Sequence, residues 1–127
     1  MLGFPSLREM DRHSGLKIWL AVAPADMRWS FDRLAQLAQN VTGQDPLGGH
    51  LFLFRSRGGD RLKALLFEGD GFALWYKRLE AGTFRFPRVA EGQTSLALRP
   101  SELAMLLEGI DLSSVKRRPR WEGAKKI

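Results

Sequence analysis

The stretch from His50 to Pro87 constrains the fold more than any other part of the sequence. It contains three apolar runs, Leu51 to Phe54, Leu62 to Phe67 and Phe72 to Tyr76, and a shorter run from Thr83 to Phe86. Turn sequences separate the runs: Arg57-Gly58-Gly59-Asp60, Gly69-Asp70-Gly71 and Glu80-Ala81-Gly82. Glycine and aspartate tolerate the positive φ angles of tight hairpins. Because such short connections join only antiparallel neighbours, the stretch predicts a four-stranded antiparallel meander.

Two further strands are expected outside the meander. The apolar run from Lys17 to Ala23 is bounded by glycine and proline, which indicates a first strand. The segment from Thr94 to Leu98 alternates, and we expect Leu96 and Leu98 to face the core.

Two helices are expected from three- and four-residue apolar spacing. The first covers residues 30 to 42, with Ser30 or Asp26 as its cap and Gly43 at its end. The second covers residues 101 to 108, with Arg99 or Ser101 near the cap and an apolar stripe of leucines from Leu103 to Leu107. Successive strands with helices at two places predict a single α+β domain, with a mostly antiparallel sheet and two helices.

The chain has 127 residues, enough for one domain with a core. We expect an irregular leader at residues 1–15, the domain at 16–112 and a flexible basic tail at 113–127. The sequence has no cysteine and no apolar run long enough to span a membrane. Its first residues lack a long apolar segment and include Glu9 and Asp11, so we do not expect a signal peptide. These features predict a cytoplasmic protein without disulfides.

The net charge of +6 is unevenly distributed. After Val115 the chain carries six positive charges and one negative charge, so the tail accounts for +5 and residues 1–115 for +1. A nearly neutral body with a basic tail is typical of a flexible arm that binds polyanions. A terminus that only keeps the protein soluble has the same composition, so both interpretations stay open.

Catalytic chemistry has little support in the sequence. Asp60 and Asp70 lie beside turn glycines, and Asp32 falls in a first helical turn, which are structural positions for aspartate. The chain has two histidines, His13 in the leader and His50 at the start of a strand, and no cysteine, which gives weak support to a metal site or a histidine-based nucleophile. We therefore predict that the protein is not an enzyme and that it has no catalytic residues, no metal site and no cofactor.

Basic residues near the first turn of the meander are the best candidates for a binding site. Arg55, Arg57 and Arg61 surround Gly58-Gly59, and we expect them to project from one hairpin tip. Strand alternation lets Lys63 and Lys77 extend this patch, with Trp75 as a platform for base stacking. The outer face of any half-solvated sheet shows a similar pattern. The DNA-binding hypothesis therefore comprises Arg55, Arg57, Arg61, Lys63, Trp75, Lys77 and the tail residues Lys116, Arg117, Arg118 and Arg120.

Four blocks of the sequence carry a family resemblance. They are Ile18-Trp19-Leu20 with Asp26-Met27-Arg28 and Phe31-Asp32; Asp45-Pro46 with Gly49 to Arg55 and Gly59 to Lys63; Asp70-Gly71 with Lys77 to Glu80, Gly82, Phe84 and Pro87; and Leu103 to Asp111. Over residues 16 to 112, the chain resembles the small accessory protein of insertion sequences of the 66 type, called TnpB or Orf-two-like protein.

The resemblance implies a bacterial protein that supports DNA transposition beside a larger transposase, to which the DNA-cutting carboxylates belong. The expected partners are DNA and that transposase, without a membrane, in the cytoplasm or on the nucleoid. Two functions remain open at this point: non-specific DNA binding, and an adapter whose sheet or Leu103–Leu107 helix docks the transposase.

Overall fold

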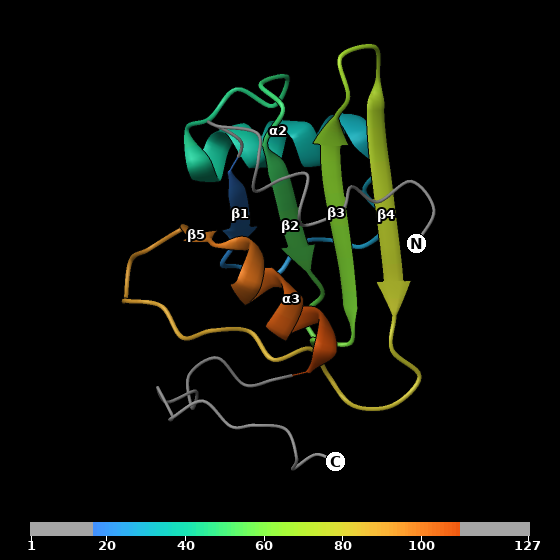
Figure 1. Ribbon diagram of the computed structural model, residues 1–127, viewed down its shortest axis with the longest axis vertical. Coiled ribbons are helices and arrows are strands. Elements are labelled where there is room, and N and C mark those ends of the chain that lie inside the picture. Colours follow the sequence, from blue (N-terminus) through green and yellow to red (C-terminus); the bar gives the residue numbers. More distant parts are fainter. Residues whose placement is uncertain (1–16, 110–127) are drawn as a thin grey trace, which may run out of the picture.

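The computed structural model describes residues 17–109, which form five strands and two helices (Figure 1). In chain order they are β1 (Ile18–Ala21), α2 (Phe31–Thr42), β2 (Leu51–Arg55), β3 (Arg61–Phe67), β4 (Phe72–Arg78), β5 (Ser95–Leu98) and α3 (Pro100–Glu108). The predicted α+β domain, with a mostly antiparallel sheet and two helices, is confirmed. The leader and the basic tail expected from the sequence lie outside the described residues.

All five strands belong to one sheet with the order β4-β3-β2-β1-β5. Strand β1 pairs in parallel with β2, because α2 carries the chain back across one face between them. The other pairings, β1–β5, β2–β3 and β3–β4, are antiparallel. The last strand, β5, therefore lies beside β1 at one edge of the sheet, while β4 forms the opposite edge.

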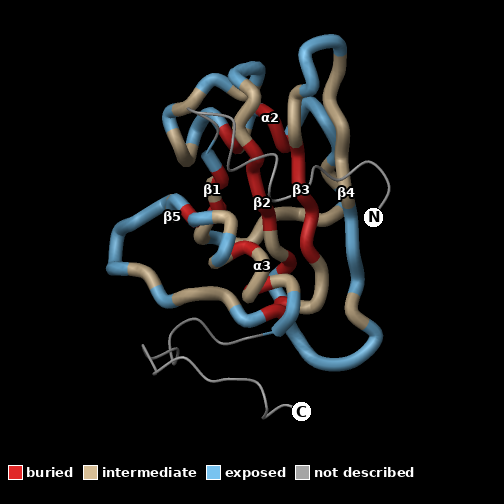
Figure 2. The backbone as a smooth tube through the Cα atoms, viewed as in Figure 1, coloured by how far each residue is buried: buried red, intermediate tan, exposed pale blue. Residues whose placement is uncertain are grey.

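The two helices lie on opposite faces of the sheet (Figure 1). On the α2 face, Leu34 and Ala38 of the helix pack with Phe52, Phe54 and Leu65. On the α3 face, Leu103 and Leu106 pack with inward residues of β1, β2 and β3. Both sides of the central strands are therefore buried, as Figure 2 shows, whereas the lower part of β4 is exposed.

The predicted fourth strand of the meander is wrong. Leu79 donates its backbone N–H to Asp60 O, and Gly82 then turns the chain with a φ of 78°. The segment from Thr83 to Phe86 crosses the β2–β3 turn instead of pairing along β4, and Phe84 donates its N–H to Gly59 O at 2.9 Å. Phe84 enters the α3-face core, so the alternating phenylalanines reflect burial without a strand ladder.

The ends of both helices agree with the sequence signals, except that Ser30 does not cap α2 through its side chain. Gly43 and Gly109 end the helices in left-handed backbone conformations. Ser30 occupies the N-cap position of α2 without a side-chain hydrogen bond. At α3, the carboxylate of Glu102 accepts the backbone N–H of Arg99 at 2.8 Å, which satisfies one free donor of the first turn.

Candidate nucleic-acid interface

The basic residues singled out by the sequence gather at one end of the sheet. Strand β2 ends there, β3 begins there and β4 ends there (Figure 1). We call this the basic end and define it by Arg55, Arg57, Arg61 and Lys77, together with Arg85 and Arg88 of the segment after β4. The β3–β4 turn, which carries Glu68 and Asp70, lies at the other end of the sheet.

The β2–β3 turn is held rigidly at the basic end. Ser56 donates its N–H to Arg61 O, and its Oγ accepts the N–H of Arg61 at 3.0 Å. Gly59 is buried with a φ of 79°, and a side chain there would lie 3.5 Å from Thr83. The returning segment therefore covers one side of the turn and leaves Arg57 exposed.

The three arginines at the β2–β3 turn do not share one face of the sheet. Arg55 lies opposite Leu62 in the sheet register, so it shares the α3 face. Arg61 precedes Leu62 and lies opposite Arg78, which places both of them on the α2 face. Arg57 lies in the turn itself and is exposed. The structure thus brings the three residues to one end of the sheet but directs them to different sides.

Arg55 is the most constrained of these arginines. Its Nε donates to Val22 O at 2.8 Å, and its guanidinium carbon lies 5.5 Å from the centre of the Phe86 ring. Arg55 and Arg88 both line an open pocket of about 350 Å³. A guanidinium that is already oriented loses less freedom when it binds an anion.

Lys63 does not extend the basic patch. Its side chain is buried on the α2 face, where Nζ donates to Trp29 O at 2.7 Å and lies 4.6 Å from the centre of the Tyr76 ring. Burial lowers the pKa of the Lys63 ammonium, because the charged form loses its hydration. The geometry makes Lys63 a contact between the sheet and the loop before α2.

Trp75 and Lys77 lie on the face opposite Lys63. Trp75 faces Ala64 across β3–β4 and packs against the core under α3, so the expected cluster of Lys63 with Trp75 is not formed. Lys77 lies opposite Leu62 of β3, and Leu62 in turn lies opposite Arg55 of β2. Lys77 is exposed at the edge of the sheet. Of the predicted sheet residues, Lys77 alone extends the surface of Arg55.

The ion pairs of the described residues leave the basic end largely unneutralised. They are Arg28 with Asp26 at 2.7 Å, Arg78 with Glu80 at 3.0 Å, and Arg99 with Glu102 at 3.7 Å. Within residues 17–109, no carboxylate lies within ion-pair distance of Arg55, Arg57, Arg61, Lys77, Arg85 or Arg88. Unpaired cations gathered at one end favour contact with an anionic partner.

Arg85 and Arg88 were missed by the sequence reasoning. Arg85 lies between Phe84 and Phe86 and is exposed, as alternation with two phenylalanines indicates. Arg88 reaches the pocket of Arg55 because the chain folds back after β4, which no local pattern records. The tail residues Lys116, Arg117, Arg118 and Arg120 lie outside the described part of the chain.

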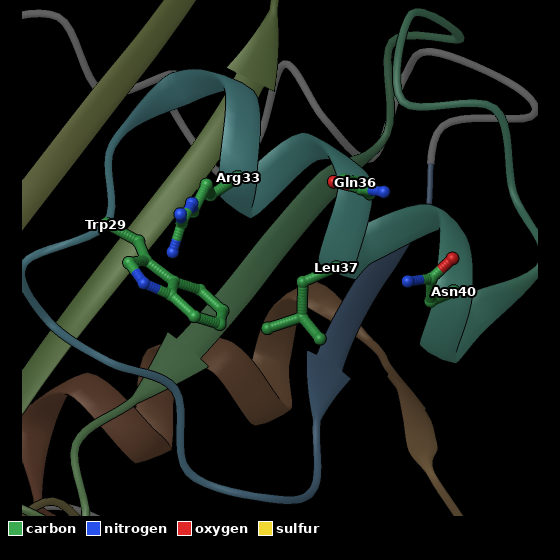
Figure 3. Close-up of a pocket in the computed structure, with 5 residues that line it drawn as sticks. All are labelled: Trp29, Arg33, Gln36, Leu37 and Asn40. Carbon is green, nitrogen blue, oxygen red and sulfur yellow. The ribbon is translucent and has the colours of Figure 1, made fainter.

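A second surface feature lies beside α2. Trp29, Arg33, Gln36, Leu37 and Asn40 line a shallow groove of about 310 Å³ (Figure 3). Figure 3 shows Trp29 and Leu37 along one side of the helix, with Arg33 directed toward Trp29. The Arg33 guanidinium carbon lies 5.4 Å from the centre of the Trp29 ring. This groove combines apolar and amide groups and lacks the charge density of the basic end.

The carboxylates of residues 17–109 are arranged as turn and cap residues. Asp26 accepts the backbone N–H of Arg28 at 2.9 Å and pairs with its guanidinium, which lowers the pKa of Asp26 from 3.8 to about 2. Asp45 accepts the backbone N–H of Leu47 in the same way. Among residues 17–109, no group of three histidine, cysteine, aspartate or glutamate side chains could hold a metal ion. Neither α2 nor α3 has the length and apolar character of a membrane-spanning helix.

Comparison with known proteins supports the family assignment. The family model described as IS66 Orf2 like protein matches residues 16–117. The uncharacterized protein y4hO of Sinorhizobium fredii is 41% identical over 96 residues, which cover 76% of this chain and 82% of the relative. The uncharacterized protein y4jC of the same organism is 38% identical over 105 residues, covering 83% and 88% of the two chains. No solved structure matches this chain.

The family match extends over the whole described domain, so it includes the basic end, both helices and every strand. Proteins of this family have an accessory role in transposition and are not known as catalysts. The chain belongs to the family of IS66 Orf2-like proteins, the accessory proteins of IS66-type insertion sequences.

Proposed function

We propose that this protein assists transposition by binding the phosphate backbone of DNA at its basic end, without sequence preference, alongside the larger transposase of the same element. The observation that carries the proposal is the positive charge of Arg55, Arg57, Arg61 and Lys77 at one end of the sheet, where they form no ion pair with any residue of 17–109. Such side chains neutralise phosphates, but only groups fixed against base edges read sequence. The basic tail adds a second source of phosphate contacts on this proposal.

The test is DNA binding across a salt series. The triple variant Arg57→Ala, Arg61→Ala, Lys77→Ala removes three charges of the basic end, and a truncation after Ser114 removes the tail. For duplex DNA, each lost phosphate contact lowers the slope of log K against log salt by about 0.9. The triple variant should therefore lose up to about 2.7 in slope, and the truncation should lose a further, additive part.

A matched control variant distinguishes the effect of charge at the basic end from the effect of the net charge of the whole protein. The triple variant Lys17→Ala, Arg33→Ala, Arg99→Ala also removes three charges, but from the start of β1, from α2 and from the cap of α3. If both triple variants lose the same slope, the attraction is a property of the whole protein. If neither loses slope and the truncation loses all of it, the DNA contact belongs to the tail alone.

The adapter function is the second candidate, and the α2 groove is the observation that favours it. The Leu103–Leu107 helix is less suited, because Leu103 and Leu106 are fully buried in the core. Binding of the purified transposase by the parent but not by a Leu37→Glu variant, with folding checked, would support docking at α2.

A further inference from the structure

The pocket around Arg55 differs from the rest of the basic end because it combines charge with an apolar wall. Two of its lining residues, Arg55 and Arg88, are cationic. Leu20, Val22, Phe86, Pro87 and Val89 supply the apolar lining. Its volume of about 350 Å³ falls within the range of small-molecule sites, about 300–1,000 Å³. A surface that only neutralised phosphates would need no such lining.

Arg55 is prepared to bind an anion in this pocket. Its Nε is occupied by Val22 O, which fixes the plane of the guanidinium, and its carbon lies near the Phe86 ring. The two terminal Nη atoms donate to no acceptor of residues 17–109. Arginine binds phosphate through two parallel N–H donors, so these free donors form the matching half of a bidentate contact.

We propose that this pocket binds one unpaired nucleotide of DNA, with its phosphate held by Arg55 and Arg88 and its base against the apolar wall. The inference rests on the proposed DNA-binding function and adds a preference for single-stranded or frayed DNA. In a duplex the base faces are stacked, so the apolar wall has no partner there. An acidic peptide would satisfy the arginines but leave the wall uncovered, which is why the observations favour a nucleotide.

The test compares a short single-stranded oligonucleotide with the duplex of the same sequence, at one salt concentration, for full-length protein. The variants are Arg55→Lys, which keeps the charge but loses the planar donor pair, and Arg88→Ala, which removes an exposed side chain without a hydrogen bond among the described residues. Each should weaken single-strand binding by about tenfold, because each removes part of the charged contact to the phosphate. In both variants the loss should be larger for the single strand than for the duplex, so the preference for the single strand should fall.

A second readout does not depend on the variants. In a two-dimensional NMR titration with the oligonucleotide, the Arg55 Nε–H signal and the methyl signals of Val22 and Val89 should shift. Addition of deoxythymidine monophosphate should shift the same signals at higher concentration, which distinguishes a nucleotide site from one that needs a longer strand. A glutamate-rich peptide is the control for an acidic protein partner.

Each outcome decides the proposal. Single-strand preference that is lost in both variants, with the pocket signals shifted, supports it. Equal binding of single-stranded and duplex DNA, or unshifted pocket signals, overturns it while leaving the proposed DNA-binding function intact. Shifts caused by the peptide and not by the oligonucleotide make the pocket a protein contact. Absence of binding to either DNA overturns both this inference and the proposed function.

Discussion

Lys63 and Lys77 provide a direct test of which cations stabilise the fold and which contact DNA. They lie on neighbouring strands and carry the same charge, but Lys63 is 6% exposed on the α2 face and Lys77 is exposed on the α3 face. Substitution of each by methionine removes one charge and keeps most of the aliphatic chain. Differences between Lys63→Met and Lys77→Met therefore arise from position.

The expected stability loss of Lys63→Met follows from its contacts. The variant loses a hydrogen bond from a charged donor, about 1.5–3 kcal/mol, and a cation–π contact of about 0.5–2 kcal/mol. Relief from burying a charge offsets part of this. We expect a net loss of about 1–2 kcal/mol, or about 5–10 °C in Tm. Lys77→Met should change stability by less than about 0.5 kcal/mol.

For DNA binding we expect the opposite order, with a larger effect of Lys77→Met than of Lys63→Met. Lys77→Met should lower the salt slope by about 0.9, and Lys63→Met should leave it unchanged. Urea unfolding followed by circular dichroism, with fluorescence anisotropy for DNA binding, measures both properties. A Lys63→Met variant that is as stable as the parent but has a lower salt slope would refute the structural role of Lys63.

The same pair gives a pH dependence. The pKa of Lys63 is lowered in the folded protein, so between that pKa and the ordinary value of 10.5 the unfolded chain binds more protons than the folded one. The free energy of unfolding of the parent should therefore rise with pH in this window, relative to Lys63→Met. A stability difference that stays constant from pH 7 to 10.5 would contradict the lowered pKa.

Three further predictions concern the fold around the basic end. Phe84→Ala should lower the free energy of unfolding in urea by about 3–5 kcal/mol, because Phe84 is buried. The neighbouring variant Arg85→Ala removes an exposed side chain and should lower it by less than about 0.5 kcal/mol. Similar losses in the two variants would mean that the segment is not part of the core. Gly59→Ala should lose about 1–2 kcal/mol, because φ is 79° there, and an unchanged Tm would show a different turn conformation. The pKa of the Asp26 carboxyl, measured by NMR, should be about 2 and should return toward 3.8 in Arg28→Ala. The stability that this carboxylate contributes is therefore present above pH 3.8 and lost as the pH falls through about 2. A pKa near 3.8 in the parent protein would argue against the ion pair.

Local signals in the sequence predicted most of the fold. Apolar spacing and Gly43 and Gly109 located both helices, and the turn glycines located the hairpins of β2, β3 and β4. The fourth strand failed for a physical reason. Alternation of apolar and polar residues indicates which side chains are buried, but it does not show that they pair in a strand. Phe84 is buried because its segment crosses the β2–β3 turn, where it has no strand to pair with.

The candidate site was harder to predict than the fold, because it depends on register and on a returning chain. Strand alternation places Lys63 on the same face as Arg61, and Trp75 on the same face as Lys77, but it does not say which pair shares the face of Arg55. Arg88 lies 33 residues after Arg55, and only the path of the segment after β4 brings it to the same pocket. Long-range packing of this kind leaves no periodic signal in the sequence.

NMR mapping of the DNA-binding surface tests the central claim most directly. Backbone amide signals of the full-length protein would be followed during titration with a duplex of arbitrary sequence. Signals of residues 55–61, 77 and 85–88 should shift, while those of residues 43–49 and 68–71 at the opposite end of the sheet should not. Shifts confined to residues 43–49 and 68–71, or to residues after Val115, would contradict DNA binding by the basic end.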